Sequence, residues 1–171
     1  MKISQIVAAR FRTAQAIQTA DNISFALSCA LPHTPPSPYT PGLLLFCAGF
    51  AVEAVSDLQK FVFKMDPRNE GKFITSGLWS LSRHPNYFGE MVLWWGIYVT
   101  SVPALTGAQH AAVLSPIALT LLLCFVSGIP ILERSADKRW GGDETYEDYK
   151  AKTPVLVPWI HTGFLEPTYD A

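Results

Sequence analysis

Three pairs of polar residues stand four positions apart beside apolar stretches of the sequence. The pairs are Glu53 with Asp57, Asn86 with Glu90, and Glu133 with Asp137. This spacing puts both members of a pair on one side of a helix. Glu53 and Glu90 each lie a turn or more inside an apolar run, where a carboxylate is costly unless it faces a polar pocket. The pattern favours a functional polar pocket over the alternative of interfacial salt bridges.

Basic residues accompany the three pairs, namely Lys60, Arg83, Lys138 and Arg139. Residues 77–91 read GLWSLSRHPNYFGEM, and Pro85 in this stretch suits the first turn of a helix, which needs no N–H from it. The exposed N–H groups of that turn, with Arg83 and His84 beside them, would receive a phosphate or carboxylate of a ligand. The alternative is a plain helix start with interfacial aromatic residues.

The sequence lacks the residue patterns that other kinds of functional site require. The three cysteines and four histidines are scattered, without an HxxxH pair or a zinc-ligand spacing, so no metal site is predicted. No GxGxxG loop, Walker loop or GxSxG turn is present, so a nucleotide pocket would have to be helical. A net charge of −1 and the lack of an arginine-rich run predict no nucleic-acid partner.

Three apolar stretches are expected to carry these residues as transmembrane helices. Residues 111–132 hold 22 residues without a charge, and at about 1.5 Å per residue they would cross a hydrocarbon layer of about 30 Å. Residues 87–105 form a second span that contains Glu90, and residues 41–56 form a shorter third. With 49% hydrophobic and 16% charged residues, the chain is predicted to be an all-α, polytopic transmembrane helical bundle.

The flanking segments are less regular. Residues 1–40 contain Pro- and Ser-rich stretches and are an uncertain segment, either a weak helix, a targeting segment or disordered. Residues 41–160 are assigned to a membrane-embedded domain and residues 161–171 to a C-terminal tail. Tyr146 and Tyr149 precede a Pro-bounded apolar stretch, which favours an interfacial cap over a ligand lid.

The distribution of basic residues predicts the topology. Residues 57–84 and the segment after 132 hold ten of the thirteen Lys and Arg residues, whereas the link TGAQH between two spans holds none. The excess of positive charge in cytoplasmic loops places both basic segments in the cytoplasm. A helical hairpin returns the chain to the side where it started, so the two segments should also be neighbours. A pocket at the cytoplasmic face is therefore expected.

Four segments together resemble the steroid 5-alpha-reductase C-terminal-domain family. These are EAVSDLQK at 53–60, GLWSLSRHPNYFGE at 77–90, LLLCFVSGIPILERSADKRWG at 121–141 and YEDYKAKTPVLVPW at 146–159. Their order and spacing also match, and the resemblance extends from about Gly42 to Trp159. The RHPNY motif is shared with sterol reductases and with isoprenylcysteine and phospholipid methyltransferases, which are similar in fold and bind S-adenosylmethionine.

The resemblance implies an NADPH site made of Asp57, Arg83, His84, Asn86, Tyr87, Glu90, Asp137, Arg139 and Tyr149. Arginine suits the pyrophosphate and the 2′-phosphate because a guanidinium donates hydrogen bonds in a planar fork. The expected protein is a multi-pass enzyme of the endoplasmic reticulum or a bacterial inner membrane that reduces a conjugated double bond in a steroid-like or other lipid enone. In the family the acid that assists this step lies in the N-terminal half, which residues 1–40 do not resemble, so no catalytic residue is assigned.

The alternatives are an S-adenosylmethionine-dependent lipid or isoprenylcysteine methyltransferase, and a non-catalytic, shortened membrane protein. Residue types favour the reductase, because Asn86 is followed by Tyr87 and Glu90, and because ERSADKRW stands where methyltransferases tend to carry a paired Glu-Glu. The sequence predicts no oligomeric state.

Overall fold

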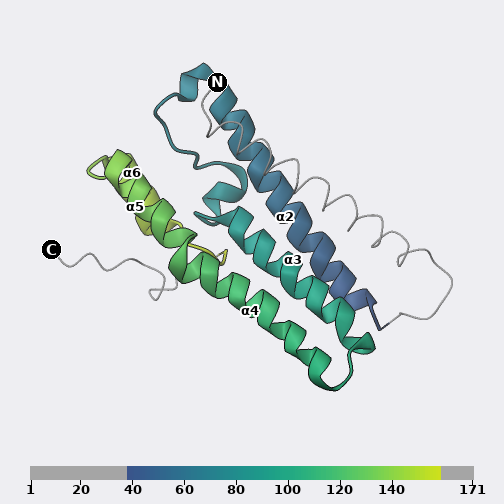
Figure 1. Cartoon of the computed structure of the whole chain (residues 1–171). Coiled ribbons are helices and arrows are strands. Elements are labelled where there is room, and N and C mark those ends of the chain that lie inside the picture. Colours follow the sequence, from purple (N-terminus) through teal and green to yellow (C-terminus); the bar gives the residue numbers. More distant parts are fainter. Residues whose placement is uncertain (1–37, 159–171) are drawn as a thin grey trace, which may run out of the picture. The chain divides into compact units, whose positions relative to one another are not determined.

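The computed structural model describes residues 38–158, which are helical with turns and loops between the helices and contain no strand (Figure 1). The all-α prediction is confirmed for this part of the chain. The expectations for the uncertain N-terminal segment, apart from residues 38–40, and for the tail at 161–171 lie outside the described residues.

Helix α2 runs from Thr40 to Met65 and helix α3 from Pro85 to Ser101. The first is longer than the apolar stretch at 41–56, because it continues through the polar residues after Val55. Helix α3 begins at the proline, as its first-turn position predicts. It ends before the predicted limit of 105, because Pro103 lies in a 3-10 turn, Val102–Ala104, and cannot continue an α-helix.

The predicted span at 111–132 is helical but not one uniform α-helix. A 3-10 helix, Gly107–Val113, leads into α4, Leu114–Leu121, then a π-helical turn, Leu122–Val126, and finally α5, Ile129–Trp140. The N–H of Ser127 donates to the carbonyl of Leu122 at 2.9 Å, which is the wider spacing of a π turn. Pro130 explains the break, because it has no N–H and its ring clashes with the carbonyl four residues earlier.

Two helical stretches are long and apolar enough to cross a membrane, Thr40–Met65 and Gly107–Trp140. The third expected span, around α3, is not among them, since α3 has 17 residues, at the lower end of what a span needs. Large apolar side chains stay exposed on the two long stretches, such as Leu44 and Leu58 on α2 and Leu114 and Leu121 on α4. Their outer surfaces therefore match lipid rather than water.

Helices α2 and α3 touch through their backbones. A methyl group added at Gly49 would lie 2.6 Å from the carbonyl oxygen of Gly89, and one added at Gly89 would lie 2.5 Å from the nitrogen of Glu53. Gly42 and Gly96 make the same kind of approach one heptad away. Small residues that allow such contact are typical of helix pairs in membranes. This packing brings the polar residues of the two helices close together.

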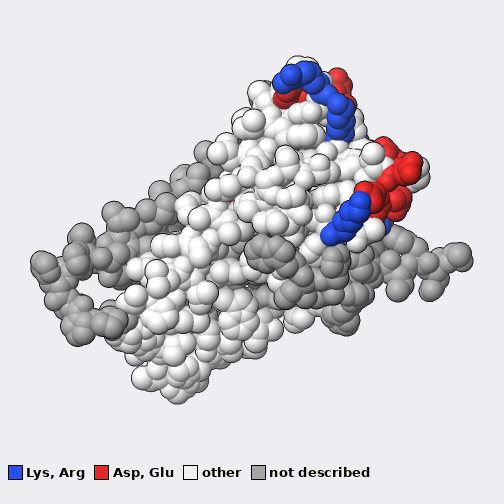
Figure 2. Space-filling view, turned by 180° about the vertical axis from the view of Figure 1, so that it is seen from behind, with Lys and Arg blue, Asp and Glu red and all other residues white. Residues whose placement is uncertain are grey.

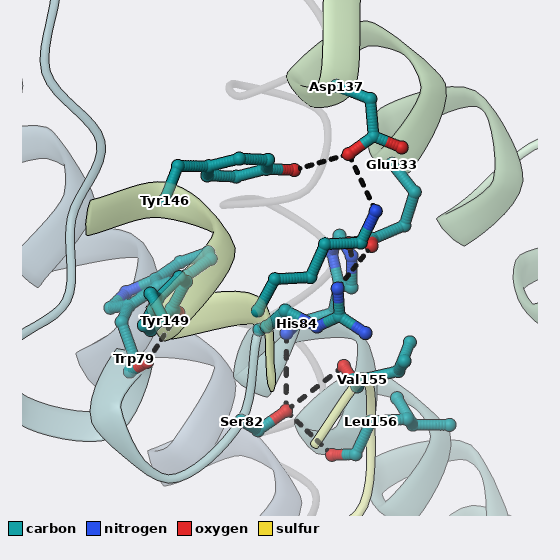
Figure 3. Close-up of polar contacts among 11 residues, drawn as sticks. Trp79, Ser82, His84, Glu133, Asp137, Tyr146, Tyr149, Val155 and Leu156 are labelled. Carbon is teal, nitrogen blue, oxygen red and sulfur yellow. Dashed lines mark hydrogen bonds and ion pairs between the residues drawn. The ribbon is translucent and has the colours of Figure 1, made fainter. Parts of the chain in front are cut away.

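The C-terminal part of the described chain packs against the start of α3. Helix α6, Glu144–Lys152, begins with the Asp143 carboxylate accepting from the N–H of Thr145 at 2.8 Å. The extended residues after it are buried, and the hydroxyl of Ser82 donates to the carbonyl of Leu156 at 2.7 Å (Figure 3). Val155 and Leu156 form a core with Met91 and Ile129. This part of the stretch expected to cap the interface is thus protein core.

Candidate functional site

Charged side chains gather at one end of the part of the chain that the structure describes. On the face shown in Figure 2, the Lys, Arg, Asp and Glu side chains gather at that end, and nearly all of the other described surface in this view carries no charged residue. Every Lys and Arg among residues 38–158 belongs to 57–84 or to the segment after 132, the two segments that the topology argument brings together. The structure confirms that they are neighbours, because both line one cavity.

The cavity has a volume of about 580 Å³. Its walls come from the end of α2, the loop at 69–74, the turn before α3, and helices α5 and α6. The basic residues in its wall are Lys60, Lys64, Lys72, Arg83 and Arg139, and the acidic ones are Glu70 and Glu133. Its aromatic residues are Phe63, Phe73, Trp79, Trp140, Tyr146 and Tyr149. A space of this size suits a small organic ligand, and we call it the charged cavity.

A buried ion pair crosses one side of the charged cavity. Nη1 of Arg83 donates to Oε2 of Glu133 at 2.7 Å, and Nε2 of His84 lies 2.7 Å from Oε1 of the same carboxylate. The side chains of Arg83 and Glu133 are each 4% exposed. Burial lowers the pKa of His84, although the neighbouring Glu133 acts in the opposite direction. The cluster is therefore close to neutral, with a positive Arg83, a negative Glu133 and an uncharged imidazole.

Two further groups shape the wall next to this ion pair. The hydroxyl of Tyr149 donates to the carbonyl of Trp79 at 2.6 Å (Figure 3). The Trp79 indole N–H donates to the carbonyl of Ser56 at 3.0 Å. Burial raises the pKa of Tyr149, so its hydroxyl stays protonated at neutral pH and remains a donor. The ammonium of Lys60 lies 4.3 Å from the centre of the Trp79 ring, a cation–π contact.

Aromatic rings also line the charged cavity. Phe73 contacts three of them, with ring centres 5.6 Å from Trp140, 5.3 Å from Tyr146 and 5.7 Å from Tyr149. The Trp140 indole N–H donates to the carbonyl of Gly71 at 2.6 Å and so holds the loop in place. Planar surfaces beside basic groups can hold a ligand that combines rings with negative charge.

Of the nine residues predicted for the cofactor site, the structure places Arg83, His84, Arg139 and Tyr149 in the wall of the charged cavity. Asp137 does not line it, but accepts from the Tyr146 hydroxyl at 2.8 Å and from Lys150 at 2.7 Å (Figure 3). The raised pKa of Tyr146, caused by burial and by this carboxylate, keeps that hydroxyl protonated.

The other four predicted residues lie between α2 and α3. The side chain of Asn86 lies near the carboxylate of Asp57, and Glu90 is close enough to Glu53 and Asp57 for their charges to interact. Tyr87 connects the two groups, because its ring stacks on His84 with centres 5.7 Å apart. The structure therefore separates the predicted site into a cationic part and an acidic part.

Several residues of the charged cavity were absent from the sequence-based site. Glu133 was predicted to belong to the polar pocket, as the i, i+4 partner of Asp137, but it was not among the nine residues of the cofactor site. Lys64 follows Lys60 by one helical turn and carries a similar signal. Phe73 and Lys72 had none, because their loop reaches the cavity only through tertiary contacts.

The described part of the chain is thus an all-helical protein with two helical stretches long enough to cross a membrane and a cavity rich in basic residues at one end. The chain matches the family described as "Protein of unknown function (DUF1295)" over residues 9–153 and belongs to that family, which includes steroid 5-alpha-reductase-like proteins. The matched region begins well before Gly42, the predicted start of the resemblance, and so includes residues 9–40, which were expected to lie outside it.

Two curated relatives carry different names. The chain is 45% identical to the probable O-methyltransferase ustE of Ustilaginoidea virens over 65 residues, which are 37% of this chain and 23% of that protein. It is 27% identical to the Delta(14)-sterol reductase of Arabidopsis thaliana over 126 residues, which are 68% of this chain and 31% of that protein. The chain thus spans less than a third of the length of either relative. No solved structure matches it.

Proposed function

We propose that this protein is a multi-pass membrane reductase that binds NADPH in the charged cavity and reduces a conjugated double bond of a steroid-like or other lipid enone. The observation that carries the proposal is the composition of the cavity wall, with five basic side chains against two acidic ones. One of the two acids, Glu133, is already paired with Arg83. The remaining positive charge suits a ligand with several phosphate charges, which NADPH has and S-adenosylmethionine lacks.

The basic residues differ in how free they are to bind phosphate. Arg83 was predicted as a phosphate ligand, but the carboxylate of Glu133 already accepts from it. Lys64, Lys72 and Arg139 form no ion pair with any residue in the described range 38–158. Arg139 also lies 4.9 Å from the centre of the Trp140 ring. We therefore assign the phosphates chiefly to these three residues, with the aromatic wall beside them for a ring of the ligand.

The acidic group between α2 and α3 would take a different part of the same ligand. Asp57, Asn86 and Glu90 offer oxygen acceptors for carboxamide and ribose hydroxyl groups. When bound, NADPH would supply a hydride for the reduction. The likeness to a sterol reductase over two thirds of this chain supports an oxidoreductase with a lipid substrate. We place the site at the cytoplasmic face of the endoplasmic reticulum or of a bacterial inner membrane, because positive charge gathers around it.

Titration of the detergent-purified protein with NADPH, NADH and S-adenosylmethionine tests this function. Replacing Arg139 by Ala should remove a charge-assisted contact of about 1.5–3 kcal/mol and so raise the Kd for NADPH about tenfold or more. Arg134→Ala is the matched control, since Arg134 is on the same helix, is exposed and does not line the cavity. At least one of Lys64→Ala, Lys72→Ala and Arg139→Ala should also reduce the preference for NADPH over NADH.

The second candidate is methyl transfer from S-adenosylmethionine, which the 45% identity to a probable O-methyltransferase over 65 residues favours. The same titration separates the two. Tight S-adenosylmethionine binding by the wild-type protein, without detectable NADPH binding, would reject the reductase. In that case Arg139→Ala should change affinity little, because no phosphate is present.

A further inference from the structure

Glu133 occupies a special position among the charged residues of the site. It extends from α5 to the turn that precedes α3, and each of its carboxylate oxygens has a partner there: Oε2 accepts from Arg83 and Oε1 contacts His84. The carboxylate is 4% exposed, so these two partners and not water surround it. It therefore connects two elements that both contribute to the wall of the charged cavity.

This geometry decides which nitrogen of His84 carries the proton. A carboxylate facing a guanidinium at 2.7 Å is ionised and can only accept hydrogen bonds. Nε2 of His84 must therefore donate to it, and so must carry hydrogen. Because the imidazole is buried and uncharged, Nδ1 then has no hydrogen and presents a lone pair.

The surroundings of Nδ1 agree with this assignment, and they indicate a function for the oriented imidazole. Within residues 38–158, Nδ1 is buried and has no hydrogen-bond partner. An acceptor left in that state costs free energy, and a native protein usually keeps such an atom for a functional reason. A structural ion pair would need only the Arg83 contact, whereas here the carboxylate also orients an imidazole in the cavity wall.

We propose that Glu133 is a positioning residue that fixes His84 as the Nε2–H tautomer and holds the Arg83 guanidinium away from the ligand phosphates. Glu133 acts through these two neighbours and does not itself bind the ligand. The site then keeps a neutral, oriented imidazole on one side and its available cations on the other. The tautomer assignment rests on the contact of Nε2 with Glu133 and on the buried Nδ1, together with the neutral state of the buried imidazole, and its effect on ligand binding rests on the proposed NADPH site.

Imidazole ¹⁵N NMR of the detergent-solubilised full chain, labelled with ¹⁵N-histidine, tests the tautomer without any ligand. The spectrum of His84→Gln identifies the His84 signal among the four histidines. The wild-type signal should report Nε2–H. In Glu133→Gln the introduced amide can donate to Nε2 while its oxygen still accepts from Arg83, so the signal should change to Nδ1–H. Glu133→Asp and the control Arg134→Gln should keep Nε2–H. A wild-type Nδ1–H signal, or an unchanged signal in Glu133→Gln, would overturn the proposal.

The affinity of Glu133→Gln for NADPH is a second measurement. It should change in opposite directions depending on whether Glu133 acts only through its charge or positions its neighbours. If Glu133 acted only through its charge, Glu133→Gln would remove a negative group from the cavity and tighten NADPH binding. If it positions Arg83 and His84, the affinity should fall about tenfold, and Glu133→Asp should recover part of the loss. Tighter or unchanged binding by Glu133→Gln contradicts the positioning role. No NADPH binding by the wild type, together with the tautomer change, rejects the proposed function alone.

Discussion

Single residues in this site are governed by burial more than by their intrinsic chemistry. His84 is beside a carboxylate that favours its protonation, yet burial is the larger influence and keeps its pKa below the ordinary 6.5. Arg83, predicted from its type as a ligand for phosphate, is already paired with Glu133 inside the protein. A side chain's type is therefore a poor guide to its role when a buried partner of opposite charge is close.

The lowered pKa of His84 predicts how stability depends on pH. Below pH 6.5 the imidazole takes up a proton in the unfolded chain but resists it in the folded protein. The unfolded state then binds more protons, so the free energy of unfolding should fall as the pH drops from 6.5 toward the folded pKa, and be unaffected by His84 above this window. Thermal unfolding in detergent across this range should show the fall. His84→Gln should flatten it, and an equally steep fall in that variant would contradict the neutral state of His84.

At the scale of elements, the contact between α2 and α3 is decided by glycines spaced seven apart. Gly42 and Gly49 on α2 face Gly96 and Gly89 on α3, and the resulting backbone contact brings Glu53 and Asp57 to Asn86 and Glu90. The sequence shows each polar pair, but only this helix contact decides that the pair on α2 lies beside the pair on α3.

Adding a single methyl group at this contact should separate the helices. Gly89→Ala places a side-chain carbon 2.5 Å from the backbone nitrogen of Glu53, which cannot move away alone, so we expect a loss of roughly 1–3 kcal/mol. In an exposed helix the same change would stabilise the protein by up to about 1 kcal/mol. A close helix contact and an exposed position at Gly89 therefore predict changes in stability of opposite sign. Ala54→Val, on the exposed side of α2, is the control with little expected effect. Unfolding of the purified variants in detergent measures the difference, and a stabilised Gly89→Ala would disprove the close contact.

At the scale of the whole described part, the two basic segments meet at one end. Asn69 from one and Tyr146 from the other line the same cavity, although they are far apart in the chain. This arrangement requires that both segments face the same side of any membrane that the long helices cross. From the positive-inside bias we propose that this is the cytoplasmic side.

Cysteine labelling tests this arrangement in intact membranes. After replacement of the native cysteines, single cysteines at Asn69 and at Glu144 should both react with a membrane-impermeant reagent only when the cytoplasmic face is accessible. A cysteine at Gly107, in the short link between α3 and the predicted span at 111–132, should react from the opposite side. Reaction of the Asn69 and Glu144 positions from different sides would contradict the shared cavity in a membrane setting.

The sequence by itself determined the helical class, the predicted spans at 41–56 and 111–132 that fall within the two candidate membrane helices, the start of α3 at Pro85 and the pairing of basic segments, because these follow from local composition, proline chemistry and spacing. It also selected four residues that line the charged cavity, Arg83, His84, Arg139 and Tyr149. Only the tertiary structure decided that Arg83 is neutralised by Glu133, that the 69–74 loop brings Lys72 and Phe73 to the site, and that Val155 is core. These features depend on contacts between residues distant in the chain, and neither periodicity nor residue type specifies which distant groups meet.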